Sequence, residues 1–140
     1  MIDTTTIYIT KTDLERLEHL IKLVRSKGEK ANFPYINALE EKLEYADTAA
    51  SEDIPSNIVT MRSKVRLNDL KTGKDTTYTL VFPSEADIDE GKISILAPLA
   101  TAILGHRLGD EVEFKSPSGL RRLAIDEIIY QPESTGEYHL

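Results

Sequence analysis

The hydrophobic period of this sequence changes once along the chain, and that change limits the folds it can adopt. Between residues 14 and 46, apolar side chains recur three and four positions apart, which is the spacing of one face of an α-helix. After position 57 the spacing becomes two, with apolar side chains at Val59, Met61, Val65 and Leu67. A helical segment followed by a strand-forming segment predicts an α+β protein.

The helical segment divides into two helices, over about 11–27 and about 32–46. Thr10 suits the N-cap of the first helix, with Asp13 three residues later in an acidic form of the capping box, and Gly28 suits its end. Two apolar stripes joined by a short loop predict an antiparallel helical hairpin, a short coiled coil. At about 1.5 Å per residue, an arm of roughly 16 residues is about 24 Å long.

The sequence predicts two domains. Residues 1–50 form the hairpin, the small and polar residues 51–57 form a linker, and residues 58–140 form the second domain. Pro98 and Gly105 bound a two-turn helix, because proline suits the first turn of a helix and glycine suits the residue after the last. The second domain is therefore expected to be an antiparallel sheet with one short helix on it, with strands over about 59–67, 76–82, 93–96, 111–115 and 120–130.

Positive charge alternates along the first expected strand, at Arg62, Lys64 and Arg66. Charged side chains of this kind protect an edge strand from pairing with other chains. The pattern predicts that this strand lies at an edge of the sheet.

Composition excludes several classes of protein. The 140 residues include no cysteine and carry a net charge of −7, which excludes disulfides and thiolate metal sites and argues against direct binding of nucleic-acid phosphate. No apolar run reaches the roughly 18–20 residues of a membrane span. The N-terminus also lacks the pattern of a signal peptide. We therefore expect a cytoplasmic protein that has no contact with a membrane.

Patterns that carry catalysis or bind cofactors are missing from the sequence. His19, His106 and His139 are scattered without the spacing of metal ligands. The sequence also contains neither a serine nucleophile elbow nor a glycine-rich phosphate loop. We expect no catalytic residue, no metal site and no cofactor, and hence a protein that is not an enzyme.

Several motifs resemble a known family. The segment ISILAPLATAILGHRLGDEVEFKSPSGLRRLAIDEIIYQ is similar to the C-terminal domain of the GreA/GreB transcript-cleavage factors, with a small helix after a proline, GDEV and a P-x-G turn. Over nearly the whole chain the sequence resembles the Rnk-type branch, the regulators of nucleoside diphosphate kinase. The motifs shared with that branch are VTM, YTLVFP, APL-x-x-AILG, YQPE and a GEYHL-like ending.

The resemblance implies a fold and a partner. Residues 58–140 would be FKBP-like, and this domain would dock on RNA polymerase at the rim of the secondary channel. The implied contacts surround Ala97 and Pro98 and include Leu96 and Leu99. Gre factors carry a polar or acidic residue and then serine before this proline, whereas this chain has Leu96 and Ala97. The docking surface is therefore expected to be more apolar here.

The expected hairpin tip differs from that of the Gre factors, whose paired acidic residues help to hold a metal ion in the polymerase active centre. Here the tip has one carboxylate, Glu29, between Lys27 and Lys30. A single carboxylate between two ammonium groups is a poor ligand set for Mg²⁺. We therefore expect a non-catalytic regulator that competes with Gre-type factors for polymerase.

Two other functions remain open from the sequence. The first is a Gre-type elongation factor that stimulates transcript cleavage. The second, less favoured, is a peptidyl-prolyl isomerase, because the implied fold is shared with FKBP proteins. Fold likeness alone supports an activity poorly, and the chain has no tryptophan and only 6% aromatic residues with which to line such a pocket.

Overall fold

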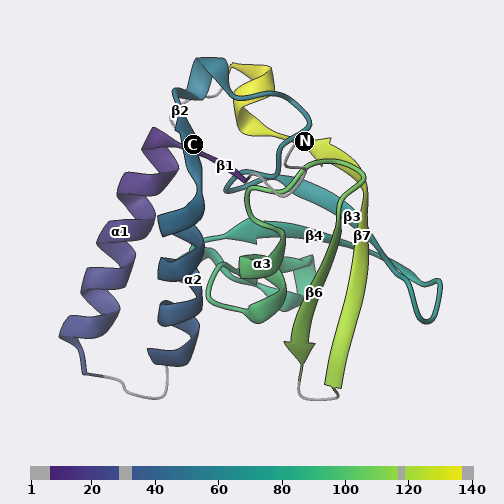
Figure 1. Cartoon of the computed structure of the whole chain (residues 1–140), viewed down its shortest axis with the longest axis horizontal. Coiled ribbons are helices and arrows are strands. Elements are labelled where there is room, and N and C mark those ends of the chain that lie inside the picture. The colour runs from purple at the N-terminus through teal and green to yellow at the C-terminus, as the bar shows by residue number, and fades with distance from the viewer. Residues whose placement is uncertain (1–6, 29–32, 117–118, 137–140) are drawn as a thin grey trace.

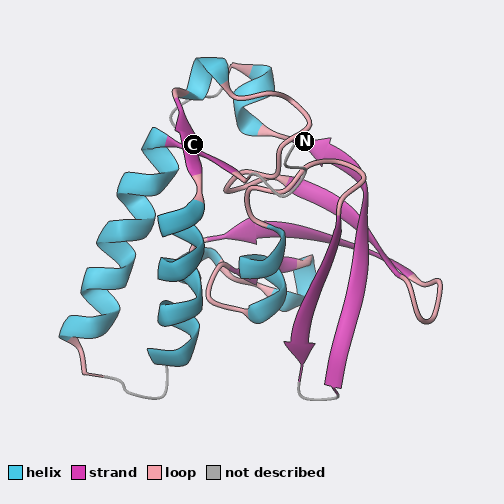
Figure 2. Cartoon of the chain, in the orientation of Figure 1, coloured by secondary structure: helices cyan, strands magenta, loops and turns pink. Residues whose placement is uncertain are grey.

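The computed structural model describes residues 7–28, 33–116 and 119–136 (Figure 1). Figure 2 shows the two long helices on one side of the molecule and the strands of the larger sheet on the other. The chain is therefore α+β, as the change of hydrophobic period predicts. In chain order the helices and strands are β1 (Tyr8–Thr10), α1 (Lys11–Ser26), α2 (Phe33–Tyr45), β2 (Asp47–Ala49), β3 (Lys64–Asp69), β4 (Asp75–Val81), β5 (Lys92–Ser94), α3 (Pro98–Ile103), β6 (Glu111–Ser116) and β7 (Gly119–Tyr130).

The ends of α1 follow local rules. Thr10 Oγ1 accepts a hydrogen bond from the Asp13 N–H at 3.0 Å, so the predicted N-cap is confirmed. Lys27 is the C-cap and Gly28 follows in the left-handed conformation, with a φ of 67°. The predicted capping box is wrong for the Asp13 side chain. Its carboxylate accepts instead from the Met61 N–H at 3.1 Å, because that donor lies buried beside it.

The base of the hairpin is closed by a two-stranded parallel ribbon that the sequence did not predict. Tyr8 of β1 pairs with Asp47 of β2, and Thr10 pairs with Ala49. Each strand has only three residues, too few to show a period of two. Because β1 precedes α1 and β2 follows α2, the ribbon joins the start of the hairpin to its end.

The larger sheet has the strand order β5-β4-β3-β7-β6. Its β3–β4, β3–β7 and β6–β7 pairs are antiparallel, but β5 runs parallel to β4. The predicted antiparallel sheet is therefore wrong at β5. The chain leaves β4 through two short 3₁₀ turns, Pro83–Glu85 and Ile88–Glu90, and this longer connection lets the next strand enter in the same direction. The sheet is mixed and curled (Figure 2).

The first strand of the larger sheet begins later than its alternating pattern predicts. Residues 59–63 form a turn in which Ser63 Oγ accepts from the Thr60 N–H at 2.9 Å and Arg62 has a φ of 64°. β3 also lies at the centre of the sheet, so the predicted charged edge strand is wrong. The charge of Arg66 on β3 is instead compensated across the sheet, since Arg66 Nη1 lies 3.0 Å from Glu127 Oε1 on β7.

One hydrophobic core joins the hairpin to the larger sheet. Leu17 of α1 and Leu39 of α2 are fully buried, in the same cluster as side chains of β3, β4, α3 and β7. The division into domains at 51–57 stays a prediction, and within that segment Ser51 and Ile54 are buried. The chain after β7, expected to be irregular, forms a 3₁₀ turn at Pro132–Thr135.

Candidate docking site

The turn before α3 is held by hydrogen bonds from both sides. Ser94 accepts two of them: its Oγ from the Leu96 N–H at 3.1 Å and its carbonyl oxygen from the Ala97 N–H at 2.9 Å. The Ala97 carbonyl then accepts from the Thr101 N–H at 3.1 Å. Pro98 occupies the first turn of α3, where no N–H is needed. The backbone of the turn is thus hydrogen-bonded on both sides.

This turn presents an apolar surface. Pro98 is exposed, and Leu96 and Ala97 are half-buried. Leu96 and Pro98 line one hollow of about 270 Å³ between α2, α3 and β6. The other lining residues of that hollow are Tyr35, Ala38, Thr101, Ala102, Phe114 and Lys115. Two of the predicted contacts, Leu96 and Pro98, thus line the same hollow, and Ala97 lies between them in the chain.

Leu99, the fourth predicted contact, lies apart from them. Its side chain lines a different hollow, of about 290 Å³, with Leu67, Tyr78 and Leu123 of the sheet. Arg121 lies at the same hollow. Leu99 and the pair Leu96 and Pro98 therefore line two different hollows.

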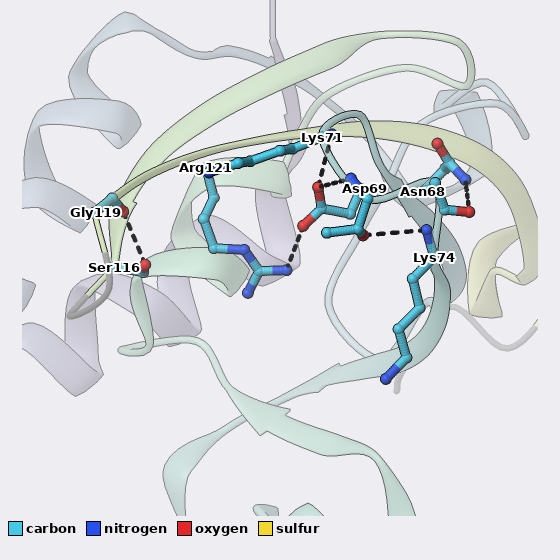
Figure 3. A network of polar contacts seen from close by, with 9 residues as sticks. Asn68, Asp69, Lys71, Lys74, Ser116, Gly119 and Arg121 are labelled. Atoms are coloured by element: carbon cyan, nitrogen blue, oxygen red, sulfur yellow. Dashed lines mark hydrogen bonds and ion pairs between the residues drawn. The ribbon is translucent and has the colours of Figure 1, made fainter.

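A polar network at this second hollow braces the turn between β3 and β4 (Figure 3). Asp69 Oδ2 lies 2.9 Å from Arg121 Nη2, and Asp69 Oδ1 accepts from the backbone N–H groups of Lys71 and Thr72 at 2.8 and 3.2 Å. The Arg121 guanidinium and these two N–H groups hold the pKa of Asp69 below its usual range. Because donors of the chain itself occupy both oxygens, the network is a brace between β7 and the turn.

Lys42 of α2 supports α3 from its other end. Its Nζ donates to the carbonyl oxygens of Thr101 and Ala102, both at 2.6 Å, in the last turn of α3. Burial lowers the pKa of Lys42 to about 7. Burial and the nearby Lys42 also lower the pKa of His106, against the opposing effect of Asp110 Oδ2 at 3.2 Å. The hairpin therefore positions α3, the helix that follows the turn at Leu96, Ala97 and Pro98.

A second buried polar contact joins α1 to the end of the chain. The Asp13 carboxylate accepts from the Met61 N–H, and the neighbouring Thr60 Oγ1 donates to Glu133 Oε1 at 2.6 Å. Burial raises the pKa of Asp13 to about 7, opposed by the Met61 N–H and reinforced by the charge of Glu133. Sequence reasoning missed this contact, because residues 131–136 show no period from which burial could be predicted.

The predicted tip residues are described only in part. Lys27 is exposed at the end of α1, while Glu29 and Lys30 lie outside the described residues. Within ranges 7–28, 33–116 and 119–136, no three or more His, Cys, Asp or Glu side chains are placed to hold a metal ion together. In the same ranges, no helix combines the length and apolarity needed to cross a membrane.

Comparison with known families identifies the chain. Residues 54–130 match the family described as "Transcription elongation factor, GreA/GreB, C-term", and residues 5–47 match the family described as "Rnk N-terminus". The chain belongs to the GreA/GreB family, in its Rnk-type branch. The resemblance carried by the motifs is therefore confirmed.

Individual relatives agree with this placement. The Rnk-type chain is 34% identical to the "Regulator of nucleoside diphosphate kinase" of Escherichia coli K12 over 136 residues, which is 96% of this chain and 97% of the relative. It is 37% identical to "Transcription elongation factor GreA" of Syntrophotalea carbinolica over 95 residues, spanning 68% of this chain and only 60% of that relative. These relatives are named as a regulator and an elongation factor rather than as enzymes.

A solved structure shares the fold. The "Prokaryotic transcription elongation factor GreA/GreB from Nitrosomonas europaea" superimposes with a TM-score of 0.73 and 38% identity. The match covers 89% of this chain and all of the other (100%). The arrangement of hairpin and sheet is thus shared with a solved member of the family.

Proposed function

We propose that this Rnk-type chain is a non-catalytic regulator that binds RNA polymerase at the rim of the secondary channel and competes there with Gre-type factors. It acts by occupying a shared site, so it needs no cofactor, and any contact with nucleic acid is indirect, through polymerase. The cytoplasm is where it meets this partner. We also propose that the hairpin is a short coiled coil and that residues 58–140 have an FKBP-like fold.

The hydrogen-bonded, apolar turn at Leu96, Ala97 and Pro98 carries this proposal. It stands where the resemblance to Gre factors implies the polymerase contact, and hydrogen bonds to Ser94 and Thr101 fix its shape before any partner arrives. A preformed site loses little conformational entropy on binding. Leu99 lines a different hollow and is left out of the proposed contact.

The length of the hairpin supports a role without transcript cleavage. α1 has 16 residues, so it is about 24 Å long. We infer that such an arm is too short to reach the active centre from the rim. The lone carboxylate Glu29 between Lys27 and Lys30 is also a poor ligand set for a second Mg²⁺. The effect on nucleoside diphosphate kinase named in the relative is then indirect, through transcription.

The test is binding to core RNA polymerase in competition with a Gre factor, followed by transcript cleavage on a stalled complex. We expect binding, mutual displacement and no cleavage. Ala97→Asp is the sharpest variant, because aspartate is a favoured N-cap and so preserves α3 while placing a charge on the apolar surface. We expect it to weaken binding about tenfold. Ala86→Asp, in the exposed loop after β4, is the matched control.

Each other result has a defined meaning. Cleavage that appears with the chain and disappears in Glu29→Ala would make it a cleavage factor. Unchanged affinity in both Ala97→Asp and Pro98→Ala would remove the docking turn from the proposal. Absence of any binding to polymerase would show that the family fold is kept here without this function.

A further inference from the structure

The side chain of Lys42 lines a hollow that the proposed function does not use. The hollow has a volume of about 360 Å³ and is formed by α2, α3, the turn after α3 and β6. Figure 1 shows α2 beside α3. The lining residues are Ala38, Lys42, Thr101, Ala102, His106, Glu111, Val112 and Glu113. A half-buried lysine therefore lies at a space large enough for a small molecule.

The hydrogen bonds of Lys42 match the donors of a neutral amine. Its Nζ donates to the carbonyl oxygens of Thr101 and Ala102, both at 2.6 Å. A neutral amine has two N–H groups and a lone pair, whereas an ammonium group has three N–H groups and no lone pair. Among the described residues, no carboxylate forms an ion pair with Lys42. The two carbonyls thus satisfy both donors of the neutral amine and leave its lone pair free.

The surroundings of Lys42 also disfavour the charged form. Burial lowers the pKa of Lys42 to about 7. A lysine in water has a pKa of about 10.4, so at neutral pH almost all of it is protonated. Only the unprotonated amine attacks a carbonyl carbon. At neutral pH a large share of Lys42 is therefore in the nucleophilic form.

A histidine at the same hollow can exchange the proton that such an attack moves. His106 Nδ1 lies 3.2 Å from Asp110 Oδ2, and this contact orients the ring. Burial and the nearby Lys42 lower the pKa of His106, so the unprotonated imidazole is favoured near neutral pH. An unprotonated imidazole accepts a proton and returns it in a later step.

The acidic side chains of the hollow decide which electrophile fits. Glu111 and Glu113 line it on β6. Glu111 Oε1 lies 3.3 Å from Arg122 Nη2, whereas Glu113 forms no ion pair within the part of the chain that the structure describes. Like charges repel, so this carboxylate disfavours an anionic reagent such as an acyl phosphate or a keto acid. A neutral carbonyl compound meets no such repulsion.

We propose that Lys42 is a nucleophilic lysine that condenses with a small neutral aldehyde in the hollow between α2, α3 and β6. The Nζ lone pair adds to the carbonyl carbon, and one N–H proton moves to the carbonyl oxygen to give a carbinolamine. The second N–H proton then leaves with that hydroxyl group as water, and a C=N bond remains. Amine and aldehyde thus give an imine and water, with no change in oxidation state.

This modification would change the contact between hairpin and α3. The neutral imine has no N–H group, so the bonds from Lys42 to Thr101 and Ala102 are lost while it exists. The reaction is stoichiometric and involves no polymerase. The proposal is therefore independent of the proposed function, and either can fail without the other.

Reductive alkylation of the wild-type chain tests the nucleophile. The folded protein is treated with propionaldehyde and sodium cyanoborohydride at pH 7, and each lysine is followed by peptide mass spectrometry. Lys92 is the matched control, since it is also half-buried but its Nζ lies 3.2 Å from Glu90 Oε2. We expect Lys42 to react about tenfold faster than Lys92, and the two to react equally in concentrated urea. Equal rates in the folded protein would overturn the proposal.

A charged aldehyde tests the selectivity of the hollow. Glyoxylate is a small aldehyde that carries a carboxylate, and its rate at Lys42 is divided by its rate at Lys92 to remove its intrinsic reactivity. We expect this ratio to be about threefold lower than the ratio for propionaldehyde. A ratio as high as that for propionaldehyde would contradict the preference for a neutral aldehyde.

The thermal midpoint tests the consequence for the fold. Alkylation replaces an N–H group of Lys42, so we expect the midpoint of the wild-type chain to fall by about 3 °C. Lys42→Met keeps an unbranched apolar side chain but has no amine, and the same treatment is expected to leave its midpoint unchanged. An equal fall in both proteins would assign the effect to other lysines and contradict the proposal.

Discussion

The two ends of the helical hairpin are built from opposite kinds of chemistry. At its base, near β1 and β2, two charged side chains make bonds away from solvent. The buried Asp13 accepts from the Met61 N–H, and the partly buried Lys42 donates to two carbonyls of α3. At its tip, Arg25 forms an ion pair with Glu40, at 2.7 Å, with both side chains about two-fifths exposed (42% and 41%).

The difference shows where the hairpin draws its stability. A buried charge cannot exchange a lost hydrogen-bond partner for water, so removing that partner is costly. The bonds of an exposed ion pair are replaced by bonds to water at little cost. The base therefore fixes the position of the hairpin against the sheet. Substitutions near the tip are therefore expected to lower stability less than substitutions at the base.

The largest expected contrast is between two leucines of α1. Leu17 is fully buried, so Leu17→Ala is expected to lower the free energy of unfolding by about 3 kcal/mol. Leu23→Ala, nearer the tip and about half exposed, is expected to cost less than about 1 kcal/mol. Urea unfolding followed by circular dichroism measures both. Equal losses would remove the distinction between the two ends.

The pH dependence of stability sharpens the comparison at Asp13. Its pKa rises from 3.8 to about 7 on folding, so the protonated carboxyl favours the fold: this stabilisation is complete below about pH 4 and is lost as the pH rises through about 7. Glu133 adds to the shift, and the Met61 N–H and Arg16 oppose it. From about pH 5 to about pH 8 we expect a loss on the order of 2 kcal/mol.

Asp13→Asn is the control for that measurement. The amide keeps an oxygen that can accept from the Met61 N–H but does not titrate, so the variant is expected to show a flatter pH profile of unfolding. Identical slopes in the two proteins would mean that Asp13 does not titrate in this range.

Two glycines in the left-handed conformation give a smaller contrast. A Cβ at Gly105, near the base, would lie 3.1 Å from both Ile7 Cβ and the Tyr8 carbonyl oxygen, whereas a Cβ at Gly28, at the tip, meets nothing within 4 Å. We expect Gly105→Ala to cost about 2 kcal/mol and Gly28→Ala about 1 kcal/mol, the second from backbone strain alone. Thermal melting of both variants tests the order.

The smallest effect is expected at the tip ion pair. Arg25→Ala removes bonds to Glu40 and Asn37 that water can replace. We expect a thermal midpoint close to wild type, with the remaining difference disappearing in high salt. A marked loss of stability that persists in salt would show that the tip is as strongly fixed as the base.

Local sequence specified most of the helices and strands. The Thr10 cap, the end of α1 at Gly28 and the start of α3 at Pro98 follow from hydrogen bonds and backbone angles within a few residues, so they could be predicted. The same holds for the candidate docking turn at Leu96, Ala97 and Pro98, since proline at 98 already determines where α3 begins. The sequence motifs also placed the chain in the GreA/GreB family.

Tertiary structure decided the rest, because those features depend on partners far apart in the chain. The parallel pairing of β1 with β2 and of β4 with β5 leaves no local pattern, and nothing near Lys64 shows that β3 lies at the centre of the sheet. The local sequence predicted a capping box with Asp13, yet its carboxylate accepts a hydrogen bond from a donor 48 residues away. The hollow of about 1030 Å³ between α1 and the segment after β4 exists only because these two parts of the chain pack side by side.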